Sequence, residues 1–241
     1  MPDSDVVLYD KRGAVGHLVL NRPRVINAFN IQMRDELYFS LSAANDDPEV
    51  RAILISGAGD RGFCAGADLS EFGSAPSQAV ARQVRWERDL WGLFMSIRKP
   101  VVASVHGFVI GSGVEITCLC DIRIASDDAV FRMPEAALSL VPAAGGTQTL
   151  SRNIGLSESM NMLLANAPID AHRALTVGLV HRLASTESVL DEGFSIADRL
   201  AGLDPEAVAS AKEAIQFGMD MPIDQGIELE RRQSARLFSS R

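Results

Sequence analysis

The sequence predicts an α/β fold with a helical region at its C-terminal end. Short apolar segments of strand length alternate with segments whose apolar residues recur at helical spacing. One strand-length segment, residues 101–105, leads through glycines into an apolar segment of helical length. From residue 188 onward the periodicity is helical throughout. We therefore expect a core over residues 1–187 and a helical region over residues 188–241.

The first half of the chain begins with two predicted strands, at residues 6–10 and 16–20, joined by a turn that contains Gly13. Asn30 is a suitable N-cap for a helix with one apolar face that ends before Pro48. A strand at 51–56 and a glycine-containing loop follow. Residues 77–98 then predict a long helix with one apolar stripe, formed by Trp86, Leu90, Leu93 and Ile97.

The second half continues the same alternation. Strands are predicted at residues 101–105, 122–125 and 129–131, and a buried helix surrounds Glu115. Two further helices, at 145–153 and 156–165, are separated by Gly155. Three helices complete the chain, at 188–201, at 205–218 and from 222 to the end.

Composition and charge exclude several classes of function. The net charge is −8, and no basic run or RNA-binding aromatic motif is visible, so an electrostatic nucleic-acid surface is not expected. No apolar run reaches the roughly 18 residues of a membrane span, and the acidic N-terminus lacks the features of a targeting segment, which predicts a cytoplasmic protein. The chain has three cysteines and no metal-binding spacing, which predicts buried free thiols.

Glu115 and Glu135 are the residues that point most directly to chemistry. Each lies in an apolar segment, where desolvation raises the pKa of a carboxyl toward the range useful for proton transfer. As alternatives, Glu115 could be the ion-pair partner of Arg123 or Arg132, and Glu135 could be only a first-turn helix acid. Two such carboxylates together favour an acid–base enzyme.

Glycine-rich turns supply the second feature of such a site. Gly111, Ser112 and Gly113 connect the predicted strand at 101–105 to the helix of Glu115. Amides at the start of a helix lack intrahelical partners and can bind an anion. The small-residue turn at 65–68 offers a further backbone amide. Tight packing of strand on helix is the alternative explanation, but the nearby Glu115 favours an oxyanion site.

A dinucleotide site is a weaker hypothesis. Residues 57–62 match G-x-G-x-x-G after a strand, but the residues that follow do not open a helix. The region about 20 residues further on holds Arg82 and Arg85 instead of the acidic residue that binds ribose. A glycine-rich loop is the better description.

The chain resembles the crotonase superfamily, the enoyl-CoA hydratase/isomerase enzymes. Seven segments carry the resemblance in family order: residues 21–28, 62–69, 99–107, 111–115, 120–125, 131–135 and 142–148. The resemblance implies a spiral of ββα units with C-terminal helices that mediate homotrimers, which often pair into hexamers. It also implies an acyl-CoA thioester as the substrate and no separate cofactor or metal.

The resemblance assigns roles to individual residues. The amides of Ala67 and Ser112 would hold the thioester oxygen, and Glu115 and Glu135 occupy the positions of the two catalytic glutamates of hydratases. The residues expected to contact the substrate and its CoA portion are Arg24, Ala28, Ala65, Asp68, Leu69 and Ser70.

The chain departs from the family pattern at several positions. Ser112 and Ala143 stand where glycine is usual, and Ser70 stands where some members have a lysine that contacts CoA. The sequence also ends at Arg241, short of the usual terminal segment.

The expected activity is enoyl-CoA hydration. One alternative is an enoyl-CoA double-bond isomerase that uses a single glutamate to move a proton. The other is a non-catalytic relative that binds acyl-CoA or RNA, against which the two glutamates and the acidic charge both argue.

Overall fold

The structure is a computed structural model that describes residues 5–71 and 87–239, and its centre is a six-stranded sheet. In spatial order its strands are β1 (Val7–Arg12), β2 (Val15–Leu20), β3 (Ala52–Gly57), β4 (Val101–Val105), β6 (Ile122–Ser126) and β9 (Arg182–Ala184). β1 pairs antiparallel with β2, and every other neighbouring pair is parallel. Parallel strands need crossover connections, and the helices between them supply these.

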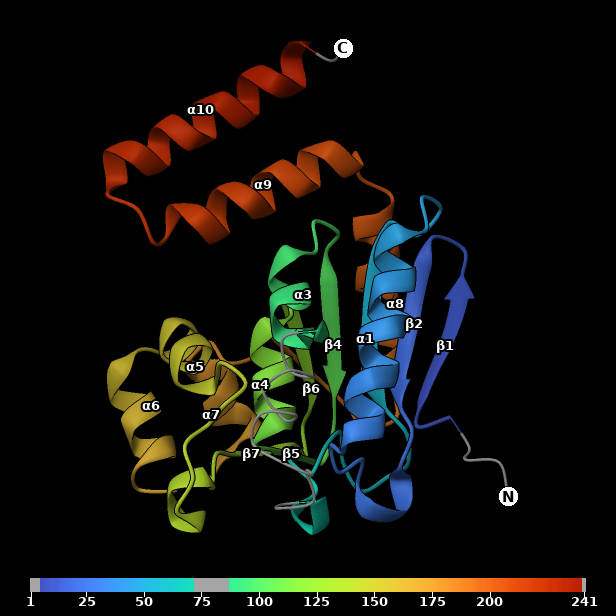
Figure 1. The fold of residues 1–241 in the computed structure, drawn as a ribbon, viewed down its shortest axis with the longest axis vertical. Helices are drawn as coiled ribbons and strands as arrows, with labels where there is room; N and C mark the ends of the chain where they lie inside the picture. The colour runs from blue at the N-terminus through green and yellow to red at the C-terminus, as the bar shows by residue number, and fades with distance from the viewer. Residues whose placement is uncertain (1–4, 72–86, 240–241) are drawn as a thin grey trace.

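Helices cover both faces of this sheet, as Figure 1 shows. α1 (Ile31–Asp46), α3 (Leu90–Ser96) and α4 (Ser112–Leu119) lie on one side, and α8 (Val189–Ala201) lies on the other. Because successive strand residues point to opposite faces, Ile53 and Ile55 enter the core beneath α1, while Leu54 packs with Ile196 of α8. The central strands β3 and β4 are therefore buried on both faces.

A second, three-stranded sheet extends the core beside α4. It contains β5 (Phe108–Ile110), β7 (Val130–Arg132) and β8 (Ile169–Asp170), with β5 and β7 parallel. α5 (Gly146–Ile154), α6 (Leu156–Leu163) and α7 (Ala171–Thr176) pack around this part of the molecule (Figure 1). The turn between β4 and β5 contains Gly107, whose φ of +52° favours glycine.

The predicted elements that fall on described residues correspond to observed ones, with ends that differ by a few residues. Asn30 caps α1 as predicted, since its side chain accepts a hydrogen bond from the Met33 amide. Of the predicted helix at 77–98, residues 77–86 lie outside the described residues. The rest is not one continuous helix as predicted, because α3 begins anew at Leu90, where the Asp89 side chain accepts a hydrogen bond from the Gly92 amide as its N-cap. The sequence analysis did not identify β5, β8, β9 or α7. Within the described ranges, no helix is both long and apolar enough to cross a membrane.

The last two helices form a hairpin that stands apart from the sheet. α9 (Pro205–Gly218) and α10 (Ile223–Ser239) pack antiparallel on each other above the core (Figure 1). Gly218 and Gly226 face each other across the hairpin, since a Cβ on Gly226 would lie 3.5 Å from the Gly218 oxygen, an ordinary van der Waals contact. None of the described residues of α10 is buried.

Candidate active site

Two glycine-rich segments lie side by side at the start of α4. Gly62 bridges to Gly107 and Cys64 bridges to Val109, so residues 62–67 run along β5. The Ile110 amide donates to the Cys64 oxygen at 2.8 Å, which fixes the register. At the end of this pairing the two segments lie against each other, since a Cβ on Gly111 would lie 3.6 Å from the Gly66 Cα. The turn that contains Ala67 and the first turn of α4 are therefore neighbours.

The amides of Ala67 and Ser112 are both available at this junction. The residues on either side of Ala67 bond to Phe29: its amide donates to the Gly66 oxygen and its oxygen accepts from the Asp68 amide. Ser112 is the first residue of α4, where an amide has no intrahelical acceptor. Within residues 5–71 and 87–239, neither amide has a hydrogen-bond acceptor. The two predicted oxyanion donors therefore lie on adjacent turns with free N–H groups.

Glu115 lies one turn inside α4 and is only 3% exposed. Its Oε1 accepts hydrogen bonds from the amides of Ala144 and Gly146, both at 3.0 Å. Gly146 is the first residue of α5, so the carboxylate also lies at the N-terminus of that helix, where negative charge is favoured. These donors stabilise the ionised form of the carboxylate.

The ion-pair alternative for Glu115 finds no support in the contacts of the two arginines. Arg123 donates to main-chain oxygens of Cys120, Gly178 and Leu179. Arg132 donates to the Asn166 side chain. Each guanidinium is engaged elsewhere, whereas Glu115 faces the loop before α5.

Glu135 differs from Glu115 in the hydrogen-bond donors around its carboxyl group. It begins the short 3₁₀ helix η3 (Glu135–Leu138). Its Oε2 is buried and has no hydrogen-bond partner in the described part of the chain. Burial raises the pKa of Glu135 above its ordinary value of 4.5. This matches the desolvation predicted for carboxyls here, and it favours the protonated form.

Glycines make room for both carboxylates. A Cβ on Gly111 would lie 2.8 Å from Glu135 Oε1, and a Cβ on Gly146 would lie 2.8 Å from Glu115 Oε1. Since Gly111 is the residue before α4, Glu135 approaches the same helix start from which Glu115 projects. The structure thus brings Glu115 and Glu135 to one place beside the free amides.

The residues expected to contact CoA form a surface next to this place. Asp68 Oδ1 accepts from Ser70 Oγ at 2.7 Å, and its Oδ2 accepts from Arg22 Nη1 at 2.9 Å. These two donors hold the pKa of Asp68 below its ordinary value. Leu69 and Ser70 are exposed on η2 (Leu69–Glu71).

The remaining expected CoA contacts lie close by in the chain. Arg22, which donates to Asp68, also donates to the Ala28 oxygen. The Ala65 amide donates to the Ile26 oxygen. Arg24 is exposed on the 3₁₀ turn η1 (Pro23–Val25).

Sequence reasoning missed three of the groups that shape this site. Arg22 lies in the same resembling segment as Arg24, but only the fold shows that its side chain reaches Asp68. The Ala144 and Gly146 amides lie about thirty residues from Glu115, and backbone donors leave no sequence signal beyond the small side chains around them.

A known family and solved structures match nearly the whole chain. The model of the enoyl-CoA hydratase/isomerase family matches residues 10–241. A short-chain-enoyl-CoA hydratase of Clostridium acetobutylicum is 34% identical, with 97% of this chain and 90% of that protein covered. A mitochondrial enoyl-CoA hydratase of Pongo abelii is 35% identical, with 95% and 79% covered.

Solved structures agree with these sequence matches. The crystal structure of an enoyl-CoA hydratase from Bacillus anthracis has a TM-score of 0.89 and 31% identity, over 95% of this chain and 90% of that one. The fold implied by the resemblance is therefore confirmed. This chain belongs to the enoyl-CoA hydratase/isomerase family.

Proposed function

We propose that this protein is an enoyl-CoA hydratase, which adds water across the 2,3 double bond of an enoyl-CoA thioester. Family membership supports the substrate class. The observation that carries the reaction type is the pair of carboxylates in contrasting surroundings. Glu115 accepts two backbone hydrogen bonds, and Glu135 has a buried oxygen without a partner. Environments that separate two carboxyls in this way suit one as base and the other as acid.

The free amides of Ala67 and Ser112 would bind the thioester oxygen. When a nucleophile adds at C3, the π electrons move toward that oxygen and give it enolate character. Preorganised N–H donors stabilise such charge by roughly 3–4 kcal/mol each in comparable sites. Both donors belong to turns fixed by the pairing of residues 62–67 with β5, so little reorganisation is needed as charge develops.

The two carboxylates divide the proton transfers. Glu115, which the Ala144 and Gly146 amides hold in place, takes a proton from water while the water oxygen bonds to C3. Glu135, whose pKa is raised by burial, gives a proton to C2 as the enolate collapses. The proton gained by Glu115 balances the one lost by Glu135, and transfer between them restores the starting state. Proton transfer alone needs no redox cofactor, and coenzyme A enters as part of the substrate.

The CoA portion would lie across the exposed turns next to the oxyanion amides. The residues proposed to contact it are Arg24, Ala28, Ala65, Asp68, Leu69 and Ser70. Ser70 Oγ already donates to Asp68, so the turn is shaped before the substrate arrives.

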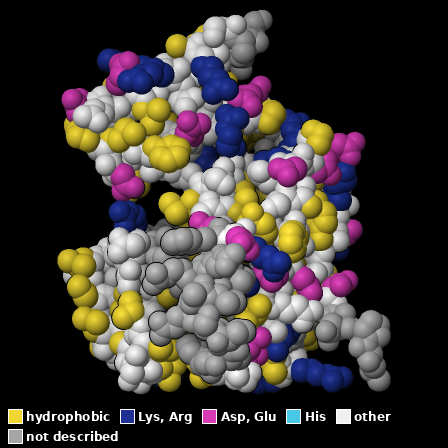
Figure 2. Space-filling view, viewed as in Figure 1, with side chains coloured by type: hydrophobic (Ala, Val, Ile, Leu, Met, Phe, Trp, Pro, Cys, Tyr) yellow, Lys and Arg dark blue, Asp and Glu magenta, His cyan; other side chains and the backbone are white. Residues whose placement is uncertain are grey.

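The C-terminal hairpin supports a homotrimer or hexamer as the assembly. Within residues 188–241, α8 packs on the sheet, so this role falls to α9 and α10. Figure 2 shows hydrophobic side chains gathered on the hairpin. The exposed ones are Ile215, Phe217, Met219, Met221, Ile223, Ile227 and Phe238. A patch of this kind on a helix pair is typical of an interface between subunits.

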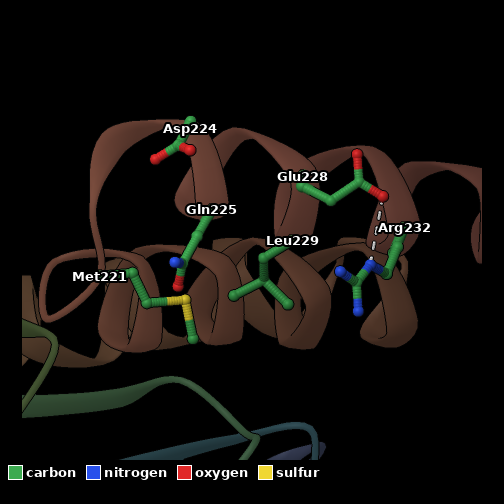
Figure 3. A pocket seen from close by; sticks show the side chains of 6 residues that line it. All are labelled: Met221, Asp224, Gln225, Glu228, Leu229 and Arg232. Atoms are coloured by element: carbon green, nitrogen blue, oxygen red, sulfur yellow. Dashed lines mark hydrogen bonds and ion pairs between the residues drawn. The ribbon is translucent and has the colours of Figure 1, made fainter.

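A groove along α10 lies within the same surface. Its lining residues come from α10 and the turn before it, as Figure 3 shows: Met221, Asp224, Gln225, Glu228, Leu229 and Arg232. Glu228 and Arg232 form an exposed ion pair one turn apart. Apolar residues flanked by charged ones resemble the core and rim of a subunit interface.

Two glutamine variants test the reaction. Glu115→Gln and Glu135→Gln should each lower kcat for crotonyl-CoA hydration at least ~100-fold, because each removes a proton-transfer group. The double variant should be little worse than the poorer single variant, since the two groups act as a unit. Wild-type protein should also hydrate crotonyl-CoA faster than it isomerises a 3-enoyl-CoA. Full hydration by Glu115→Gln, with Glu135→Gln inactive, would instead indicate an isomerase.

A further inference from the structure

Arg22 joins the two segments that flank the proposed oxyanion donor Ala67. Its Nη1 donates to Asp68 Oδ2 at 2.9 Å and to the Ala28 oxygen. The side chains of Arg22 and Asp68 are 22% and 17% exposed, so the pair is largely shielded from water. A shielded ion pair holds its geometry better than one in full solvent contact.

The main chain of Arg22 is itself fixed. Its amide donates to Asn27 Oδ1 at 2.8 Å, and its oxygen accepts from the Asn27 amide at 2.9 Å. Asn27 is fully buried, and its Nδ2 donates to the oxygens of Ala58, Gly62 and Phe63. The guanidinium therefore projects from a turn that is tied to the loop leading into Ala67.

Ala67 lies between the two groups that Arg22 holds. Phe29 bonds to Gly66 and Asp68 on either side of Ala67, and Arg22 donates to the Ala28 oxygen on one segment and to the Asp68 side chain on the other. Rotation of the Ala67 N–H away from its present direction would pull Asp68 from Arg22. The arginine also neutralises a carboxylate one residue away from the point where an enolate develops.

We propose that Arg22 is a positioning residue that orients the Ala67 amide toward the thioester oxygen through Asp68 and Ala28. The inference rests on the proposed function for its kinetic test, and a spectroscopic test separates the two. The negative charge on the thioester oxygen is larger in the transition state than in the bound substrate. We therefore expect Arg22 to stabilise the transition state more than it strengthens substrate binding.

Steady-state kinetics with crotonyl-CoA give the first test. Arg22→Met keeps the length of the side chain and removes its charge and donors. It should lower kcat about 10- to 100-fold, less than the loss of a whole oxyanion donor, with KM changed less than about threefold. Arg22→Lys keeps a charge for Asp68 and should recover part of kcat. Asp68→Asn should resemble Arg22→Met, and the double variant should be little worse than either single variant. Arg22→Lys and Asp68→Asn decide the matter if Arg22→Met does not fold.

Arg182→Met is the matched control. Arg182 also pairs with a carboxylate, Glu192 at 3.0 Å, but it lies on the edge strand β9 outside the proposed site. Its kcat should equal that of the wild type. Wild-type kcat in folded Arg22→Met or Asp68→Asn would overturn the proposal.

A shortened substrate distinguishes positioning from direct contact with CoA phosphates. Crotonyl-pantetheine has the thioester but lacks the nucleotide and its phosphates. If Arg22 positions Ala67, Arg22→Met should lower kcat by the same factor on both substrates. A loss confined to KM for the CoA thioester would show that Arg22 binds phosphate, and the positioning role would be wrong.

The infrared carbonyl stretch of bound butyryl-CoA, labelled with ¹³C at the thioester carbon, needs no turnover. Two amide donors should shift this band to lower frequency in the wild type and in the Glu115→Gln variant. The shift should shrink in Arg22→Met. A shifted band in a wild type that does not hydrate crotonyl-CoA would reject the proposed function and keep the inference. An unchanged shift in Arg22→Met would reject the inference alone.

Discussion

Ser112 places only its main chain in the proposed chemistry. It is the first residue of α4, a position that accommodates proline because the missing N–H has no intrahelical acceptor. Ser112→Pro is therefore a selective amide deletion and should lower kcat about 10²- to 10³-fold. Ser112→Ala should retain most activity. A thousandfold loss in the folded Ala variant would show that the hydroxyl takes part.

Glu135 links the site to stability through its raised pKa. Between 4.5 and that raised value, the folded protein binds more protons than the unfolded chain, so stability falls as pH rises through this interval. Glu135→Gln removes the effect and should raise the free energy of unfolding at about pH 7 more than at about pH 4. Urea denaturation at the two pH values measures the difference.

Glu158 is the matched control for that experiment. Its pKa is lowered, chiefly by the Arg173 hydrogen bond, so its contribution is present above the unfolded pKa and is lost as pH falls. Glu158→Gln should therefore destabilise the protein at about pH 7 and destabilise it less at about pH 4, with the effect fading further as pH falls through the folded pKa of Glu158. The same sign of change in both variants would contradict the assignment of Glu135.

The functional importance of a residue could be predicted where its side chain differs in polarity from the residues around it. Glu115 and Glu135 stand out because a carboxylate in an apolar segment is rare. Arg22 did not stand out, because its role depends on a turn in which Ile26 and Asn27 both have positive φ. The amides that hold Glu115 belong to Ala144 and Gly146, which carry no polar side chain at all.

At the scale of elements, α9 is held to the core by ion pairs. Lys212 Nζ donates to Asp121 Oδ2 at 2.8 Å and to the Lys99 oxygen, and its side chain is only 9% exposed. Lys212→Met would leave the Asp121 carboxylate without its cation and should lower the free energy of unfolding by about 3 kcal/mol. Urea denaturation gives the change, and faster amide exchange in α9 would locate it.

Arg98→Met is the control for the Lys212 experiment. Arg98 forms an ion pair with Glu206, which lies on α9 like Lys212, but both side chains of this pair are about half exposed. Its loss should lower stability by less than about 1 kcal/mol. Equal effects of the two variants would show that the burial of Lys212 does not matter.

Elements were predictable when they were long or strongly apolar. α9 was predicted with its observed bounds from its helical apolar spacing, and the structure adds that the Asp204 side chain caps it and Pro205 occupies its first turn. β5 and β9 have three residues each, too few for a period to emerge. Both are defined by pairing with residues far along the chain, which a local pattern does not contain.

At the scale of the whole molecule, the exposed hairpin predicts self-association. Light scattering should give three or six times the chain mass of 26.0 kDa. The double variant Phe217→Glu/Ile227→Glu should dissociate the assembly, because it puts charge on residues that are 54% and 43% exposed in one chain. A 26.0 kDa species of the wild type at micromolar concentration would contradict this.

Leu8→Glu is the control for the assembly. Leu8 is 43% exposed, which matches Ile227, but it lies on edge strand β1 at the opposite side of the sheet from β9. The Leu8→Glu variant should form an assembly of the same mass as the wild-type assembly. Dissociation by Leu8→Glu would move the interface from the hairpin to that sheet edge.

Gly111 and Gly146 make the reaction vulnerable to a single methyl group. An alanine at either position would press on a glutamate oxygen from 2.8 Å while leaving every ionisable group in the sequence unchanged. A relative could thus retain both glutamates and still be inactive. To recognise active members of this family from sequence, one should therefore check the empty space beside each carboxylate as carefully as the carboxylates themselves.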